Sequence, residues 1–107
     1  MKNNLFESME NEVLHLMLRN RPSLLAQLKN ATIISREFTG VGFYSNFYVE
    51  NNMSNEGNVL LPNARGRVNN NVDVGFVLFV SGGKLSCLEG YTYDEPWPEI
   101  IESYKVF

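Results

Sequence analysis

The sequence predicts an α+β domain in which an N-terminal helical hairpin packs on a mainly antiparallel sheet of four to six strands. Apolar residues recur at helical spacing over residues 5–28. From Ala31 onward, short β-branched and aromatic runs alternate with turns rich in Gly, Asn and Pro. Helices that precede a run of strands are typical of α+β folds, and 107 residues are enough for one core. We therefore expect residues 1–107 to form a single domain.

The helical hairpin is predicted by two apolar stripes and by the position of one proline. The first helix is expected to end near Arg19 and Asn20, because Arg21 precedes Pro22 and is biased away from the α region. Pro22 then suits the first turn of a second, shorter helix. The stripe of the first helix consists of Leu5, Phe6, Met9, Val13, Leu16 and Met17, and that of the second consists of Leu24, Leu25 and Leu28.

The first two strands are predicted over residues 31–38 and 43–49. The second of these alternates, so that Tyr44 and Tyr48 point to the face opposite Phe43. Two short helices can cover only one face of a sheet. The face that carries Tyr44 and Tyr48 is therefore expected to be partly exposed, covered by loops or used for binding.

The later strands rest on signals of different strength. A short strand over residues 59–61 is expected to end at Pro62, and residues 62–71 form a polar stretch. Residues 72–80 are largely apolar on both faces, as in a central strand, and a glycine turn leads to a partner strand over residues 85–91.

The C-terminal segment is expected to be mostly irregular. Residues 92–98 contain two prolines, which disfavour regular structure. Residues 99–103 are predicted to form one helical turn, and residues 104–107 to add a final edge strand.

The composition excludes several classes of protein. One Cys rules out a disulfide framework, and one Cys with one His cannot build a zinc site from several such ligands. The net charge of −3 and the pI of about 5.1 argue against nucleic-acid binding. No run approaches the roughly 20 apolar residues that cross a membrane, and the polar start is unlike a signal peptide. We expect a cytoplasmic protein with no membrane partner.

The residues that could carry catalysis are isolated from one another. Cys87 lies in mid-strand, and the single imidazole, His15, is predicted on the outer face of the first helix, so we expect no thiol–imidazole pair. The carboxylates between Glu89 and Glu102 lack the spacing of a calcium loop or of a glycosidase pair. We therefore predict a protein that is not an enzyme, with no catalytic residues, no metal ligands and no cofactor.

Acidic and aromatic residues gather near the C-terminus. Residues 89–107 hold five acids and one base, which gives a net charge of −4 there and of +1 in the rest of the chain. Tyr and Trp are frequent in interface hot spots, and nearby acids attract a basic partner. Alternatively, Trp97 and the tyrosines close the core, and both interpretations can hold together. The candidate partner-binding residues are Tyr91, Tyr93, Asp94, Glu95, Trp97 and Glu99, with Tyr44 and Tyr48 as second choices.

Two segments of the chain, GVGFYSNFYV and GFVLFVSGGKLSCLEGYTYDEPWPE, resemble a family of small bacterial proteins. The shared patterns are TGVGF-x-x-F-x-V and GFVLF-x-x-G-x-L-x-x-LEGYTY-x-E-x-WP, and they cover about half of the chain. The family is associated with immunity proteins of polymorphic-toxin and contact-dependent inhibition systems. The resemblance implies a cytoplasmic, non-catalytic protein that binds one cognate toxin domain, often a nuclease with a basic active site, and neutralises it by occlusion.

The alternative is a structural or regulatory protein that self-associates through the open sheet face. That interpretation predicts a homodimer in which Tyr44 and Tyr48 are buried. Both alternatives assign the chain to binding rather than to chemistry.

Overall fold

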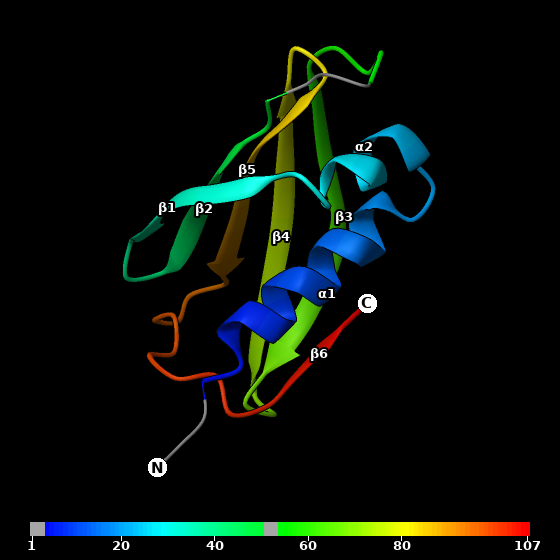
Figure 1. Cartoon of the computed structure of the whole chain (residues 1–107). Helices are drawn as coiled ribbons and strands as arrows, with labels where there is room; N and C mark the ends of the chain where they lie inside the picture. The colour runs from blue at the N-terminus through cyan, green and yellow to red at the C-terminus, as the bar shows by residue number, and fades with distance from the viewer. Residues whose placement is uncertain (1–3, 51–53) are drawn as a thin grey trace.

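A computed structural model of the chain describes residues 4–50 and 54–107 (Figure 1). These residues form two helices and six strands, and the strands make one sheet. The elements in chain order are α1 (Phe6–Leu18), α2 (Pro22–Gln27), β1 (Thr32–Phe38), β2 (Gly42–Tyr48), β3 (Val59–Val68), β4 (Val72–Ser81), β5 (Lys84–Thr92) and β6 (Tyr104–Val106).

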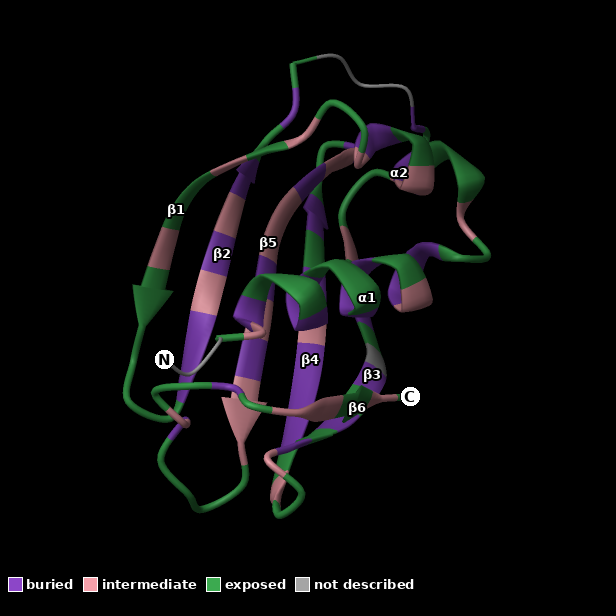
Figure 2. Ribbon diagram, turned by 60° about the horizontal axis from the view of Figure 1, so that its bottom comes forward, coloured by how far each residue is buried: buried purple, intermediate pink, exposed green. Residues whose placement is uncertain are grey.

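The sheet is antiparallel throughout, with the strand order β1-β2-β5-β4-β3-β6. Helix α1 crosses one face of this sheet, and β6 returns to pair with β3 at the edge opposite β1 (Figure 1). Burial is concentrated in the central strands and on the side of α1 that faces them, whereas β1 is mostly exposed (Figure 2). The predicted α+β class, with a helix packed on an open antiparallel sheet, is confirmed.

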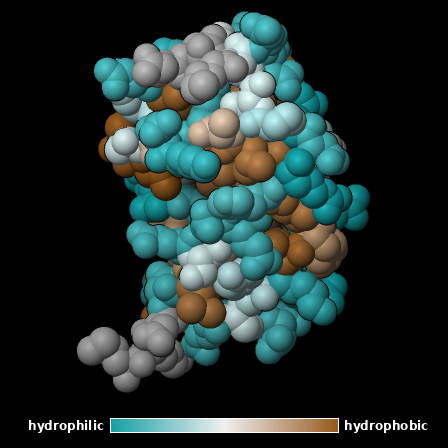
Figure 3. Space-filling model, turned by 45° about the vertical axis from the view of Figure 1, so that its right-hand side comes forward, coloured by the Kyte–Doolittle hydropathy of each residue, from teal (hydrophilic) through white to brown (hydrophobic). Residues whose placement is uncertain are grey.

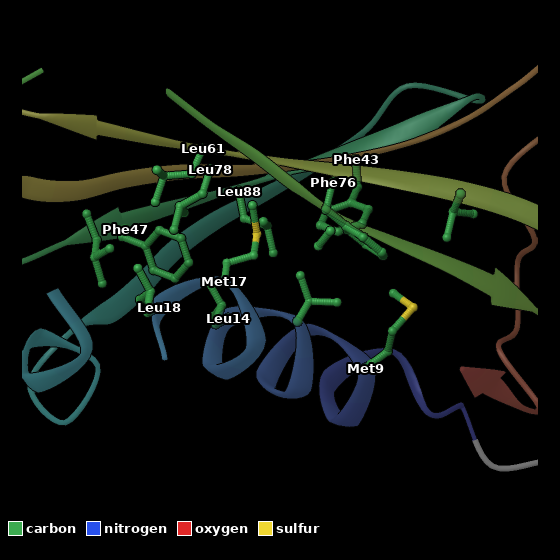
Figure 4. Close-up of a cluster of buried hydrophobic side chains, with 14 of the residues drawn as sticks. Met9, Leu14, Met17, Leu18, Phe43, Phe47, Leu61, Phe76, Leu78 and Leu88 are labelled. Atoms are coloured by element: carbon green, nitrogen blue, oxygen red, sulfur yellow. The ribbon is translucent and has the colours of Figure 1, made fainter. Parts of the chain in front are cut away.

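The core lies between α1 and the sheet. Alternate residues of β4 are buried, as the two-residue period of a strand requires when one face is covered. From α1, side chains of Met9, Leu14, Met17 and Leu18 reach toward the strands (Figure 4). Each fully buried side chain of this size contributes about 1.5–3 kcal/mol. The sheet side chains that pack against these residues of α1 include Phe43, Phe47, Leu61, Phe76, Leu78 and Leu88.

The predicted helical hairpin is wrong, because α1 is the one described helix with seven or more residues. Pro22 begins α2 as expected, but α2 has only six residues. The side chain of Gln27 explains the position of α2. The amide nitrogen of Gln27 donates to the carbonyl of Gly83 at 2.7 Å, and its side-chain oxygen accepts from the amide of Leu85 at 3.0 Å. Helix α2 therefore caps the β4–β5 turn instead of pairing along α1. Among the described residues, no helix is long and apolar enough to cross a membrane.

Two predicted boundaries near the polar stretches are also wrong. Strand β3 continues through Pro62 to Val68, because the pairing with β4 shifts between Leu61 and Ala64 and the proline falls within that irregularity. Residues 99–103 are irregular and do not form a helical turn. In both places the outcome depends on pairing between segments distant in sequence, which local patterns do not report.

A buried carboxylate lies within the apolar layer between α1 and the sheet. Glu10 is 3% exposed, and Arg36 of β1 binds it with two hydrogen bonds, from Nη2 to Oε1 at 2.7 Å and from Nε to Oε2 at 3.2 Å. The hydroxyl of Ser45 on β2 donates to Oε2 of the same carboxylate. The Arg36 guanidinium also lies 5.5 Å from the centre of the Phe6 ring. The hydrogen bond with Glu10 is the main reason that the pKa of Arg36 is raised.

We expect Glu10→Ala to lower the free energy of unfolding by about 3 kcal/mol, because it leaves the Arg36 guanidinium and the Ser45 hydroxyl without their acceptor. The triple variant Glu10→Leu, Arg36→Met, Ser45→Ala should lie within about 1 kcal/mol of the wild type, because it replaces the ion pair and the buried hydroxyl that contacts it with apolar groups. Urea unfolding followed by the fluorescence of Trp97, the single Trp, measures both.

The matched control is Glu7→Gln, on the same helix. The Glu7 carboxylate is exposed and lies 3.8 Å from Arg36, so its loss should change the free energy of unfolding by less than about 0.5 kcal/mol. Equal effects of Glu10→Ala and Glu7→Gln would show that the buried pair does not stabilise the fold.

Candidate functional site

The acidic loop, residues 93–99, follows β5 and lies at the end of the sheet beside the β1–β2 turn. Two backbone hydrogen bonds fix it there: the amide of Thr92 donates to the carbonyl of Val41 at 2.9 Å, and that of Trp97 donates to the carbonyl of Gly40 at 2.8 Å. The hydroxyl of Thr92 also donates to the carbonyl of Glu95. The acidic loop is therefore held at both ends by the sheet.

Trp97 is the anchor of the acidic loop. It is 8% exposed, and its ring packs edge-on against Phe43 at a centroid distance of 5.1 Å. The ring of Phe6 packs against the ring of Phe43 at a centroid distance of 4.7 Å. Gly90 makes room for this cluster, since a Cβ there would lie 2.1 Å from Phe43. Of the two interpretations of Trp97, the structure therefore shows the one in which its ring closes the core.

The charged residues of the acidic loop point away from that core. Asp94, Glu95 and Glu99 are exposed, as is the ring of Tyr93. Asp94 adopts a positive φ of 76°, a conformation that Asp tolerates better than most residues. The loop thus presents three carboxylates and one tyrosine to solvent.

A groove of about 590 Å³ lies between the acidic loop, the β1–β2 turn and the start of α1. Phe6, Phe38 and Trp97 provide its aromatic lining, and Glu99 supplies a carboxylate. Phe38 is mostly exposed. The groove therefore combines apolar contact area with negative charge, and it is large enough to accept a side chain from another molecule.

The open face of the sheet, the face away from α1, carries the other predicted tyrosines. Tyr44 and Tyr48 lie on it, as expected from their alternation with buried residues of β2. The ring of Tyr91 covers Gly75, where a Cβ would come within 2.5 Å of it, and it packs edge-on against Tyr93 at 5.6 Å. Partial burial and the hydrogen bond with Tyr93 raise the pKa of Tyr91.

One half of the open face, formed by β1, β2 and β5, carries the acids Glu37 and Glu89. These two residues flank Tyr44 in register across the three strands. The negative charge of Glu89 and its hydrogen bond with Tyr44 raise the pKa of that phenol. We call this region the acidic half. Lys84 lies at its far end, where its ammonium group donates to the carbonyl of Glu50.

The other half of the open face, formed by β4, β3 and β6, carries Arg65, Arg67 and Lys105, and we call it the basic half. Asp73 neutralises one of these charges through an ion pair with Arg67 at 3.0 Å. The sequence pattern placed both arginines in the polar stretch of residues 62–71, beyond the predicted end of the strand, and gave no signal for Glu37. Only the register of the strands brings these residues onto one surface.

A shallow hollow of about 620 Å³ lies on the open face where the two halves meet. Tyr44, Leu60, Phe79 and Cys87 contribute to its lining. Leu60 is 54% exposed, and Phe79 is also exposed. By contrast, the side of the molecule seen in Figure 3 is mainly hydrophilic, with its hydrophobic side chains in separate patches.

Cys87 and His15, the thiol and the imidazole of the chain, have separate environments in the described structure. Burial and the charge of Glu89 raise the pKa of Cys87, so its thiol stays protonated and poorly nucleophilic near neutral pH. Nδ1 of His15 lies 2.9 Å from the carbonyl oxygen of Asn11 in its own helix. Among the described residues, no hydrogen bond joins His15 to Cys87. No group of three or more potential metal ligands occurs in residues 4–50 and 54–107.

Comparison with protein-family models, with curated proteins and with solved structures finds no match for the chain.

We expect Glu89→Gln to lower the pKa of Tyr44 toward the ordinary value for tyrosine, because it removes the nearby negative charge that opposes formation of the phenolate. An NMR titration of ¹³C-labelled tyrosine between pH 8 and about pH 12 would measure this pKa, with Tyr44→Phe to assign the signal. Asp73→Asn, on the other half of the face, is the control. An unchanged Tyr44 titration in Glu89→Gln would contradict the described pairing.

Proposed function

We propose that this chain is a cytoplasmic, non-catalytic binding protein of the immunity type, which neutralises a cognate bacterial toxin domain by covering it. The observation that carries the proposal is the acidic loop, in which Asp94, Glu95 and Glu99 are exposed on a backbone that the sheet holds in place. The resemblance to immunity proteins described above supports the same role.

The mechanism is electrostatic and steric. A nuclease domain needs positive charge to hold phosphate, so its active site attracts a surface with exposed carboxylates. Trp97 and two backbone hydrogen bonds hold the loop in place before a partner binds. Binding therefore costs the loop little conformational entropy. Tyr93 and the lining of the groove supply apolar contact area beside the charges. Occlusion of the partner's active site needs no chemical step in this chain.

Trp97 has an indirect role in this proposal. Its buried ring supports the loop, while the candidate contacts are Tyr91, Tyr93, Asp94, Glu95 and Glu99. Tyr44 lies farther along the open face, beside Glu89. Tyr48 is at the end of β2 away from the acidic loop, so we place it outside the main contact.

Self-association through the open face is a second candidate function. A specific observation favours it: the two halves of that face carry opposite charge, with Glu37 and Glu89 on one and Arg65 and Lys105 on the other. A surface of this kind is complementary to a second copy of itself. The two candidates share Tyr91, whose ring lies on the open face, whereas the acidic loop itself lies at the end of the sheet.

The test of the first candidate uses the product of the reading frame directly before this one, which the proposal expects to contain the toxin domain. We expect co-expression to restore growth, and the purified proteins to form a complex whose association rate falls at least about tenfold from 50 to 500 mM salt. The triple variant Asp94→Asn, Glu95→Gln, Glu99→Gln should slow association by about tenfold or more at low salt. Stopped-flow fluorescence measures the rates.

The control removes the same charge elsewhere, with Glu12→Gln, Glu50→Gln and Glu56→Gln. It should slow association by less than about threefold, since its charges lie away from the loop. A complex that both triple variants form at the wild-type rate would place the contact elsewhere. Absence of both rescue and complex would overturn the proposal.

A further inference from the structure

The open face has the size of a protein interface. Alternate residues of strands with 7, 7, 10, 10, 9 and 3 residues place about 20 side chains on it. A standard interface uses about 20 to 30 residues on each side. The face also exposes apolar groups that water does not favour, among them Leu60, Phe79 and Tyr48, which is 55% exposed. Its area is thus sufficient for a stable complex.

The charges of the face are divided by strand, apart from Lys84 at the far end of β5. The acidic half holds Glu37 and Glu89 on β1 and β5, whereas the basic half holds Arg65 and Lys105 on β3 and β6, with Arg67 neutralised by Asp73. The boundary between the halves runs between β5 and β4, which are the two central strands of the order β1-β2-β5-β4-β3-β6. Three strands therefore lie on either side of it.

This division selects one symmetry for a pair of identical chains. A twofold axis parallel to the strands and between β5 and β4 reverses the strand order of the second copy, so that each acidic half lies over a basic half. A twofold axis across the strands would instead lay each half over itself. Like charges would then face each other, which disfavours that arrangement.

We infer that the open face binds a second copy of this chain in a face-to-face homodimer, with its twofold axis parallel to the strands between β5 and β4. This inference rests on the second candidate function above. Glu89 of each copy lies across the interface from the basic half that carries Arg65 in the other copy, and the interaction occurs twice. Leu60 and Phe79 of each copy meet the strands that carry Tyr44 and Cys87 in the other, which covers the hollow.

The test compares charge-reversal variants by sedimentation velocity over a wide range of protein concentration. Glu89→Arg alone and Arg65→Glu alone should each weaken self-association by about 100-fold, because like charges then meet at two places. An equimolar mixture of the two variants should recover an affinity within about tenfold of the wild type, since every pair across the interface is again of opposite sign. Circular dichroism checks that each variant is folded.

The controls reverse charges at exposed positions outside the open face, with Glu12→Arg on α1 and Lys29→Glu after α2, and they should leave the affinity within about threefold of the wild type. A wild-type protein that stays monomeric up to about 1 mM would overturn both this inference and the self-association candidate, and the inhibitor proposal would stand. If the wild type forms a dimer and neither Glu89→Arg nor Arg65→Glu changes its affinity, the dimer uses another surface. Single variants that weaken the dimer but do not rescue each other when mixed would rule out the proposed symmetry.

Discussion

Helix α1 has one apolar side, while the sheet that it packs on has two faces with apolar residues. The 13 residues of α1 cover the face formed by Phe43, Phe76, Leu78 and Leu88. The described residues contain no second helix of comparable length, so the opposite face is left without a helical layer. Tyr44, Tyr48, the divided charges and the hollow all lie on that uncovered face. The open face, which is the candidate surface for self-association, is thus uncovered because few residues of the chain form helix.

The buried Glu10 carboxylate connects α1 with two strands of the sheet. It joins the helix to β1 through Arg36 and to β2 through Ser45. A helix that slid along the sheet would leave this carboxylate buried without its partners, at a cost of several kcal/mol. Because Phe6 belongs to the same helix, the ion pair also places that ring against Phe43. The packing of Trp97, which anchors the acidic loop, therefore depends on the position of α1 on the sheet.

The acidic loop and the open face offer two binding surfaces of different character. The loop is small and strongly acidic, and its backbone is held by the carbonyls of Gly40 and Val41. The open face is broad and carries both signs of charge. A compact acidic surface suits fast association with a basic partner, whereas a broad face with both signs suits a copy of itself. A dimer on the open face would leave two acidic loops exposed, so one assembly could bind two partner molecules.

The sequence by itself determined the features that depend on near neighbours along the chain. The two-residue period of β2 placed Tyr44 and Tyr48 opposite Phe43, the apolar run of β4 and the glycine turn predicted the central hairpin, and the acids near the C-terminus predicted a charged surface. Tertiary structure alone decided the features that depend on distant segments. The pairing of β3 with β4 extended that strand through Pro62, and Arg36 and Ser45 reached Glu10 across 26 and 35 residues. The strand order, which is not the chain order, brought Glu37 and Glu89 onto one half of the open face and placed Arg65 and Lys105 on the other. Periodicity reports which side of its own strand a residue occupies, and only pairing between strands decides which residues become its neighbours.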